Sequence, residues 1–178
     1  DGTGLSIGGI QFNIGSGTLQ PLLNDIIDLN RPLVVEIFGE SKTQSIESML
    51  SLTTTDAQVN WAISIHDGND IEDTWKSAFK ALCSTPEFIA IEMKYIKEKY
   101  ASHALKDFNY FNFSTLRALS LMFDIAVQCG GIGQADELPL IESQINENTG
   151  DIEKMTVISN VVAENSASSW VEAVRARK

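Results

Sequence analysis

Apolar residues recur at intervals of three and four along most of the chain after residue 18, which is the spacing of amphipathic α-helices. The pattern predicts helices over residues 19–27, 32–38, 41–50, 59–63, 75–82, 88–106, 115–129, 137–146, 151–163 and 166–178. Residues 33–38 also fit a short strand. The pattern as a whole predicts a mainly α fold with the helix over 88–106 as its longest element.

The first 23 residues break this pattern. They hold six of the chain's twelve glycines, which alternate with apolar and short polar side chains. Because glycine lacks Cβ, it permits tight turns and lets a ligand or another backbone approach closely. The segment therefore predicts a small Gly-rich β hairpin. Ser16 or Thr18 is expected to cap the helix that follows, with Pro21 in its first turn.

Polar residues between the helices predict where several helices begin and end. Asp70 and Ser114 are expected to act as N-caps, and Pro86 fits a first helical position. Gly130 and Gly131 are expected to end the helix before them. The acidic segment 66–73 lacks the residue order and the distal glutamate of an EF-hand loop, so no metal site is predicted.

The helix over 115–129 is apolar on most sides, which predicts a buried central helix. One stripe differs, because Arg117, Ser120, Asp124 and Gln128 fall on a single face. Two interpretations stay open. The stripe lines a wet cleft, or its polar groups are satisfied inside the protein, and the second is favoured for Arg117 and Asp124.

Composition is that of a globular protein, with 43% hydrophobic and 21% charged residues, and the length allows a substantial core. The net charge of −11 argues against nucleic acid and anionic membrane surfaces as partners, and it slightly favours a cationic polymer such as chitosan. No run of eighteen apolar residues occurs, so no membrane-spanning helix is predicted. Cys83 and Cys129 lie outside any metal-ligand pattern, and two buried thiols are favoured over a disulfide.

Residues 1–8, Asp-Gly-Thr-Gly-Leu-Ser-Ile-Gly, resemble the Asp-Gly-Arg-Gly-Ile-Thr-Phe-Gly signature of glycoside hydrolase family 46 chitosanases. Residues 9–23 are more similar to the family's bacterial and phage relatives, which have lysozyme-like, peptidoglycan-degrading domains. Residues 118–132 resemble the family's long core helix. The resemblance implies one lysozyme-like α+β domain over residues 1–178 that cleaves glycans with inversion.

The resemblance also implies roles for residues in the first segment. Asp1 matches the family's general base, and Ser6 matches the hydroxyl that orients the attacking water. Gln11 matches a sugar-binding glutamine, Asn13 is its companion, and Asp124 joins the substrate-binding set on the stripe. Inverting enzymes hold two carboxyl groups about 6.5–9.5 Å apart. The family's general acid precedes the motif, so no residue is assigned to that role and an upstream segment is expected.

Three functional hypotheses follow. The first is a cofactor-independent muramidase-like hydrolase of β-1,4-linked amino-sugar polymers, with peptidoglycan preferred and chitosan as the alternative substrate. Such domains resemble phage endolysins and antibacterial toxins, and this resemblance implies secretion or delivery to the bacterial periplasm and an immunity protein as partner. A further C-terminal segment is expected as well. The second hypothesis is a non-catalytic glycan-binding module. The third is a helical interaction domain, in which both motif matches are accidental.

Overall fold

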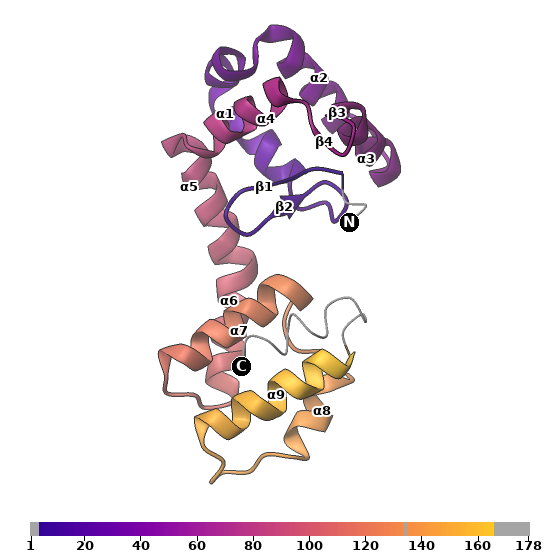
Figure 1. The fold of residues 1–178 in the computed structure, drawn as a ribbon. Helices are drawn as coiled ribbons and strands as arrows, with labels where there is room; N and C mark the ends of the chain where they lie inside the picture. The colour runs from indigo at the N-terminus through magenta and orange to yellow at the C-terminus, as the bar shows by residue number, and fades with distance from the viewer. Residues whose placement is uncertain (1–3, 134, 166–178) are drawn as a thin grey trace. The chain divides into compact units, whose positions relative to one another are not determined.

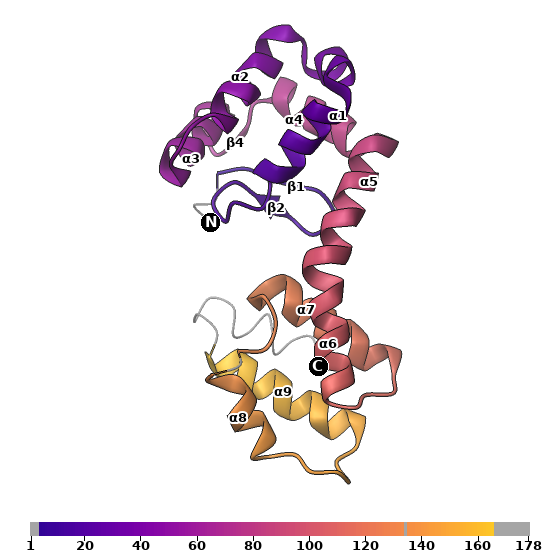
Figure 2. The ribbon, with the colours of Figure 1, turned by 180° about the vertical axis from the view of Figure 1, so that it is seen from behind.

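The computed structural model describes residues 4–133 and 135–165. The chain divides into two compact units, the first ending at Tyr95 and the second beginning at Ile96. Helices make up most of both units, and the strands of the described residues are short (Figures 1 and 2). This confirms the predicted mainly α class. The lysozyme-like assignment and the single-domain interpretation stay predictions.

The first unit contains two small antiparallel hairpins and five helices among its described residues. The elements are β1 (Ser6–Ile7), β2 (Phe12–Asn13), α1 (Gln20–Phe38), α2 (Glu40–Leu50), α3 (Thr55–Ser64), β3 (His66–Asp67), β4 (Asp70–Ile71), α4 (Asp73–Cys83) and α5 (Pro86–Tyr95). Helix α1 packs against α2, α4 and α5, so it lies at the centre of this unit. Its inner face is formed by Leu22, Leu23 and Ile26, each at most 1% exposed.

Helix α1 includes residues 33–38, whose sequence fits either a helix or a short strand. Residues 32–38 are helical, and the strand interpretation is wrong. The helix bends at Asn30, which has non-helical dihedral angles (φ −153°, ψ 64°), and Asn30 Oδ1 accepts a hydrogen bond from Leu33 N at 3.2 Å. Pro32 explains the bend, because proline has no N–H to donate and its ring clashes with the preceding turn.

Four aromatic rings of the first unit pack together. Phe38 meets Phe79 edge to face with ring centroids 5.0 Å apart, and Trp61 meets Trp75 at 5.7 Å. Trp61 Nε1 also donates to Ser45 Oγ at 2.9 Å, which satisfies its polar atom. Edge-to-face pairs of this kind stabilise a core beyond the area that they bury. This cluster joins α1, α3 and α4.

Helical structure is continuous from Pro86 to Tyr110, through α5, η1 (Ile96–Ala101) and α6 (Ser102–Tyr110). Proline stands at the first helical position, as predicted. The expected helix over 88–106 is therefore helical throughout, but η1 is a π-helix with wider turns. Because the number of residues per turn changes in η1, a helical wheel drawn with 3.6 residues per turn assigns residues after Tyr95 to the wrong face of the helix.

The second unit is built around α7 (Leu116–Cys129), which packs against α6 and α9 (Asp151–Asn165). Its inner residues Ala118, Met122 and Ile125 are at most 2% exposed, which confirms a buried central helix. Gly130 ends α7 in the left-handed conformation, as predicted. Helix α8 (Glu137–Glu142) is shorter than the predicted 137–146. The helix predicted over 166–178 lies outside the described residues.

Three predicted caps are wrong. Thr115, and not Ser114, caps α7 through a hydrogen bond from Ala118 N, while Ser114 donates from both N and Oγ to Asp151 Oδ2 at 3.0 and 3.1 Å. Helix α1 begins after Leu19, which gives no side-chain cap. Glu72, and not Asp70, precedes α4. In each case the side chain that was expected to cap the helix makes a hydrogen bond or an ion pair with another residue instead.

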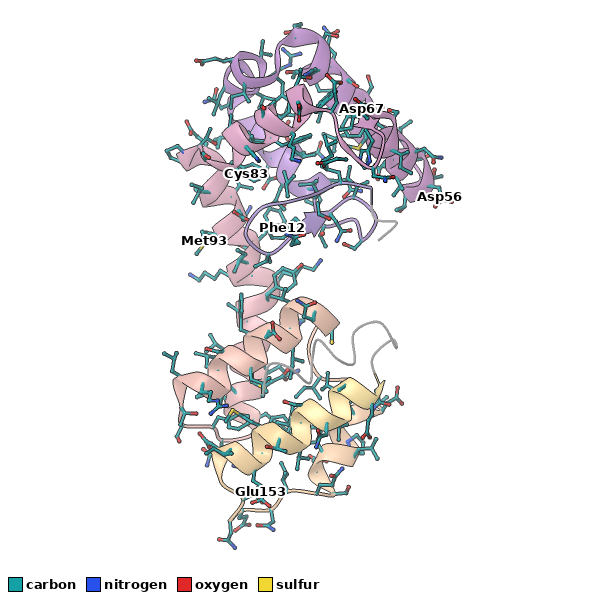
Figure 3. The ribbon with its side chains drawn as sticks, viewed as in Figure 1. Phe12, Asp56, Asp67, Cys83, Met93 and Glu153 are labelled. Atoms are coloured by element: carbon teal, nitrogen blue, oxygen red, sulfur yellow. The ribbon has the colours of Figure 1, made fainter. Side chains whose placement is uncertain are left out.

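The two cysteines do not form a disulfide with each other. Cys83 is half-buried at the end of α4 (Figure 3), whereas Cys129 is exposed. The expectation of two buried thiols is therefore wrong for Cys129. It is the last residue of α7, directly before the left-handed Gly130 at which the helix ends.

Candidate functional site

A groove of about 720 Å³ runs beside the β1–β2 hairpin in the first unit. The hairpin contributes Ser6, Gly8, Gly9 and Gln11 to its wall. The opposite wall comes from β4, α4 and α5 and contains four charged side chains, Asp70, Lys76, Lys80 and Glu92. Hydroxyl, amide, carboxylate and ammonium groups therefore face one open groove. Such a groove suits a polar, extended ligand.

The hairpin is short and its turn is strained. Ser6 pairs with Asn13 and Ile7 with Phe12, which leaves residues 8–11 to reverse the chain. Gly8 (φ +83°) and Gln11 (φ +63°) both adopt the left-handed region. This conformation suits glycine but is uncommon for glutamine, and non-glycine residues held there often lie at functional sites. Phe12 is only 2% exposed and anchors the hairpin in the core (Figure 3), while Gln11 is exposed.

Glu92 fastens this turn to α5. Its side chain is buried, and Oε1 accepts a hydrogen bond from Gly9 N at 2.6 Å. A Cβ at Gly8 would lie 2.2 Å from the same oxygen, so only glycine lets the carboxylate approach this closely. The short bond is charge-assisted and stronger than a neutral one. The hydrogen bond from Gly9 N to Glu92 therefore fixes the backbone segment between Ser6 and Gln11.

Two of the charged side chains in the groove form an ion pair. Lys76 Nζ contacts Asp70 Oδ2 in an ion pair, and Ile71 N donates to Asp70 Oδ1 at 2.8 Å. The Lys76 hydrogen bond, followed by that from Ile71, holds the pKa of the Asp70 carboxyl below its usual value. Asp70 thus stays ionised at neutral pH. Among the described lining residues two lysines oppose two carboxylates, so the groove does not share the strong negative charge of the whole chain.

The predicted site residues fall in different places. Asp1 lies outside the described residues. Ser6 and Gln11 come together in the groove. Asn13 does not line it, because its Oδ1 accepts from Ser16 N at 2.7 Å and its N donates to Thr18 Oγ1 at 2.9 Å. These bonds close the turn after the hairpin, which also explains why Thr18 does not cap α1.

Asp124 lines a cavity of about 310 Å³ in the second unit. Arg117, Ser120 and Asp124 of α7 form one side, and Met155, Thr156 and Ser159 of α9 are among the residues of the other. Three members of the predicted polar stripe thus line a cavity, which supports the wet-cleft interpretation. Internal satisfaction, the interpretation favoured from the sequence, does not fit Arg117, which is exposed, whereas for Asp124, which has a further interaction, it stays a prediction.

Sequence reasoning missed Glu92, Lys76 and Lys80 as groove residues. A signal for Glu92 is present in the sequence, because it lies four residues after Phe88 and one after Ile91 on the buried stripe of α5. A carboxylate on an apolar stripe requires a partner. The lysines carry no such signal, since they occupy the polar face of an amphipathic helix.

Within residues 4–133 and 135–165, no group of three or more His, Cys, Asp or Glu side chains is arranged to hold a metal ion. Over the same residues, no helix combines the length and apolarity needed to cross a membrane. Comparison of the chain with protein-family models, with characterised proteins and with solved structures gives no match.

Proposed function

We propose that the protein is a glycoside hydrolase that cleaves β-1,4-linked amino-sugar polymers, with peptidoglycan as its preferred substrate. One observation carries the proposal: Ser6 and Gln11, the motif residues to which the resemblance assigns water positioning and sugar binding, line the same groove. They are carried by a hairpin whose turn is fixed by Glu92. Fixed placement matters, because catalytic groups must keep their geometry to within fractions of an ångström.

In the proposed reaction, Asp1 removes a proton from a water molecule and Ser6 holds that water against the sugar ring. Gln11 binds a hydroxyl or amide of the sugar through its exposed side-chain amide. Glu92 is a positioning residue, because its bond to Gly9 N sets the turn between Ser6 and Gln11. Asp70 is unsuited to be the general acid, since its ion pair with Lys76 keeps it ionised. None of the described residues is assigned that role.

The charge of the groove bears on the substrate. Chitosan is a polycation and would gain from a strongly negative groove, to which the net charge of −11 had pointed. The described lining residues instead balance, with Lys76 and Lys80 against Asp70 and Glu92. A balanced groove favours the N-acetylated sugars of peptidoglycan over a polycation. This substrate implies secretion or delivery to the periplasm, where an inhibitor protein that plugs the groove would protect the producing cell.

The test is release of reducing ends from purified sacculi and, separately, from chitosan. Tested together with the upstream segment that the resemblance implies as the source of the general acid, the protein is expected to act on sacculi, and Asp1→Asn should lower the rate by about 10²–10⁴-fold. Ser6→Ala should also lower it, whereas Ser6→Thr keeps the hydroxyl and should retain activity. Ser48→Ala, an exposed serine on α2, is the matched control and should leave the rate unchanged.

Three outcomes would contradict parts of this proposal. Release of reducing ends from neither polymer would remove the hydrolase function. Binding of sacculi without cleavage would favour the non-catalytic glycan module. Full activity of Ser6→Ala would remove the water-positioning role while leaving the enzyme class intact.

A further inference from the structure

We infer that the cavity between α7 and α9 binds a short zwitterionic peptide with small aliphatic side chains. The cavity lies wholly within the second unit, so the inference goes beyond the proposed hydrolase and does not depend on it. Its volume of about 310 Å³ stands at the lower end of the usual range for small-molecule sites. Its walls combine an aliphatic floor with polar groups, the composition typical of such sites.

The first observation is an unsatisfied hydroxyl. Ser159 is 1% exposed and lines the cavity, and its Oγ has no hydrogen-bond partner within the described part of the chain. Buried polar atoms are nearly always hydrogen-bonded, and a serine inside a helix usually bonds to the carbonyl four residues earlier. A bound group that supplies a donor or acceptor would satisfy this hydroxyl. An amide of a peptide can supply either.

The second observation is the placement of two opposite charges on α7. Arg117 and Asp124 are seven residues apart on the same face, which corresponds to about 10 Å along a helix. An extended peptide spans about 3.3–3.6 Å per residue, so about three residues cover this distance. A carboxylate end would then meet Arg117 and an ammonium end Asp124. An ionised carboxylate offers several acceptor positions, so Asp124 can serve an ammonium beside its other contacts.

The third observation is the floor of the cavity. Leu121 and Met155 are each 8% exposed and contribute an aliphatic and a thioether group to the lining. Small aliphatic side chains would pack on these groups. None of the described residues that line the cavity is aromatic, so the flat rings on which sugars commonly stack are not found there. The cavity therefore favours a peptide over a saccharide.

The test is titration of the full chain with tri-L-alanine, followed by isothermal calorimetry and by amide chemical shifts. Saturable binding with shifts at the cavity residues is expected. N-acetylation of the peptide removes its ammonium and C-amidation removes its carboxylate, and each should weaken binding about tenfold or more. Arg117→Gln should weaken binding to a similar degree. Lys106→Gln, which removes an exposed charge on α6 in the same unit, should not.

Ser159→Ala separates a ligand role from a structural one. The variant should stay folded in a thermal melt, because it removes a hydroxyl that has no partner in the described structure, yet its affinity for tri-L-alanine should fall. Lack of saturable binding would overturn the inference, as would equal affinity for the capped peptides or for Arg117→Gln. Saturation by N-acetylglucosamine oligomers in place of the peptide would also overturn it. Loss of hydrolase activity on sacculi would not affect these measurements.

Discussion

Replacement of Gly8 by alanine tests how the candidate groove is built. Gly8 adopts a φ of +83°, and an added Cβ would lie 2.2 Å from Glu92 Oε1. The glutamate side chain would have to move away, and it would then release Gly9 N, which it now holds at 2.6 Å. The substitution therefore combines a backbone penalty with the loss of a long-range hydrogen bond.

Both contributions have an expected size. An L-residue in the left-handed region costs about 1–2 kcal/mol. A hydrogen bond to a charged group contributes about 1.5–3 kcal/mol. Gly8→Ala should therefore lower the free energy of unfolding of the first unit by about 2.5–5 kcal/mol. Glu92→Ala should lower it by about 1.5–3 kcal/mol, and the double variant should be no less stable than Gly8→Ala alone, because the bond can be lost only once.

Gly17 provides the matched control. It has a similar φ of +69° in the segment after the hairpin, but nothing lies within 4 Å of an added Cβ. Gly17→Ala should therefore show only the backbone penalty of about 1–2 kcal/mol. Urea unfolding can be followed by fluorescence in a Trp170→Phe background, in which the two remaining tryptophans, Trp61 and Trp75, both report on the first unit.

Equal losses for Gly8→Ala and Gly17→Ala would refute the reasoning. So would additive losses in the Gly8→Ala and Glu92→Ala double variant, because additivity means that the two residues do not interact. Either result would leave the hairpin held by its buried apolar side chains, such as Phe12, and Glu92 would then lose its role as a positioning residue.

Two further predictions concern titratable groups. Burial raises the pKa of the Asp107 carboxyl, so Asp107 favours folding most at acidic pH and this contribution is lost as the pH rises through its folded-state pKa. Asp107→Asn should therefore gain stability relative to the parent as the pH rises from mildly acidic to neutral in urea unfolding, and a pH-independent difference would contradict this. Burial likewise raises the pKa of the Cys83 thiol, whereas Cys129 is exposed. Iodoacetamide should modify Cys129 first when followed by mass spectrometry, and equal rates would count against the burial of Cys83.

The sequence predicted the helices well where an apolar stripe continues over several turns. Trp75, Phe79 and Leu82 recur at helical spacing, and all three are buried on α4. The same rule worked for α7, whose ends are set by Thr115 and Gly130. Burial of apolar side chains stabilises these helices more than any other interaction, and it depends on spacing that the sequence shows directly.

Caps and site residues were harder to predict, because they depend on partners outside the local segment. Thr18 satisfies every local rule for an N-cap, but its hydroxyl is used by Asn13. On α5, Ile89 and Met93 are apolar yet 43% and 57% exposed, and Met93 projects away from the helix (Figure 3). The charged Glu92 between them is buried. Glu92 is buried because it accepts a hydrogen bond from Gly9 N, and Gly9 lies 83 residues earlier in the sequence, where no local pattern can reveal it.

The bond between Gly9 and Glu92 has a consequence for how the protein is made. The two residues are 83 positions apart, and a ribosome releases the N-terminus first. The hairpin leaves the exit tunnel well before its anchor on α5 is synthesised, and an isolated two-stranded hairpin is marginally stable at best in water. The hairpin is translated before α5 and is thus among the last parts of the first unit to become fixed, and a chain that stops before α5 would carry the groove without Glu92.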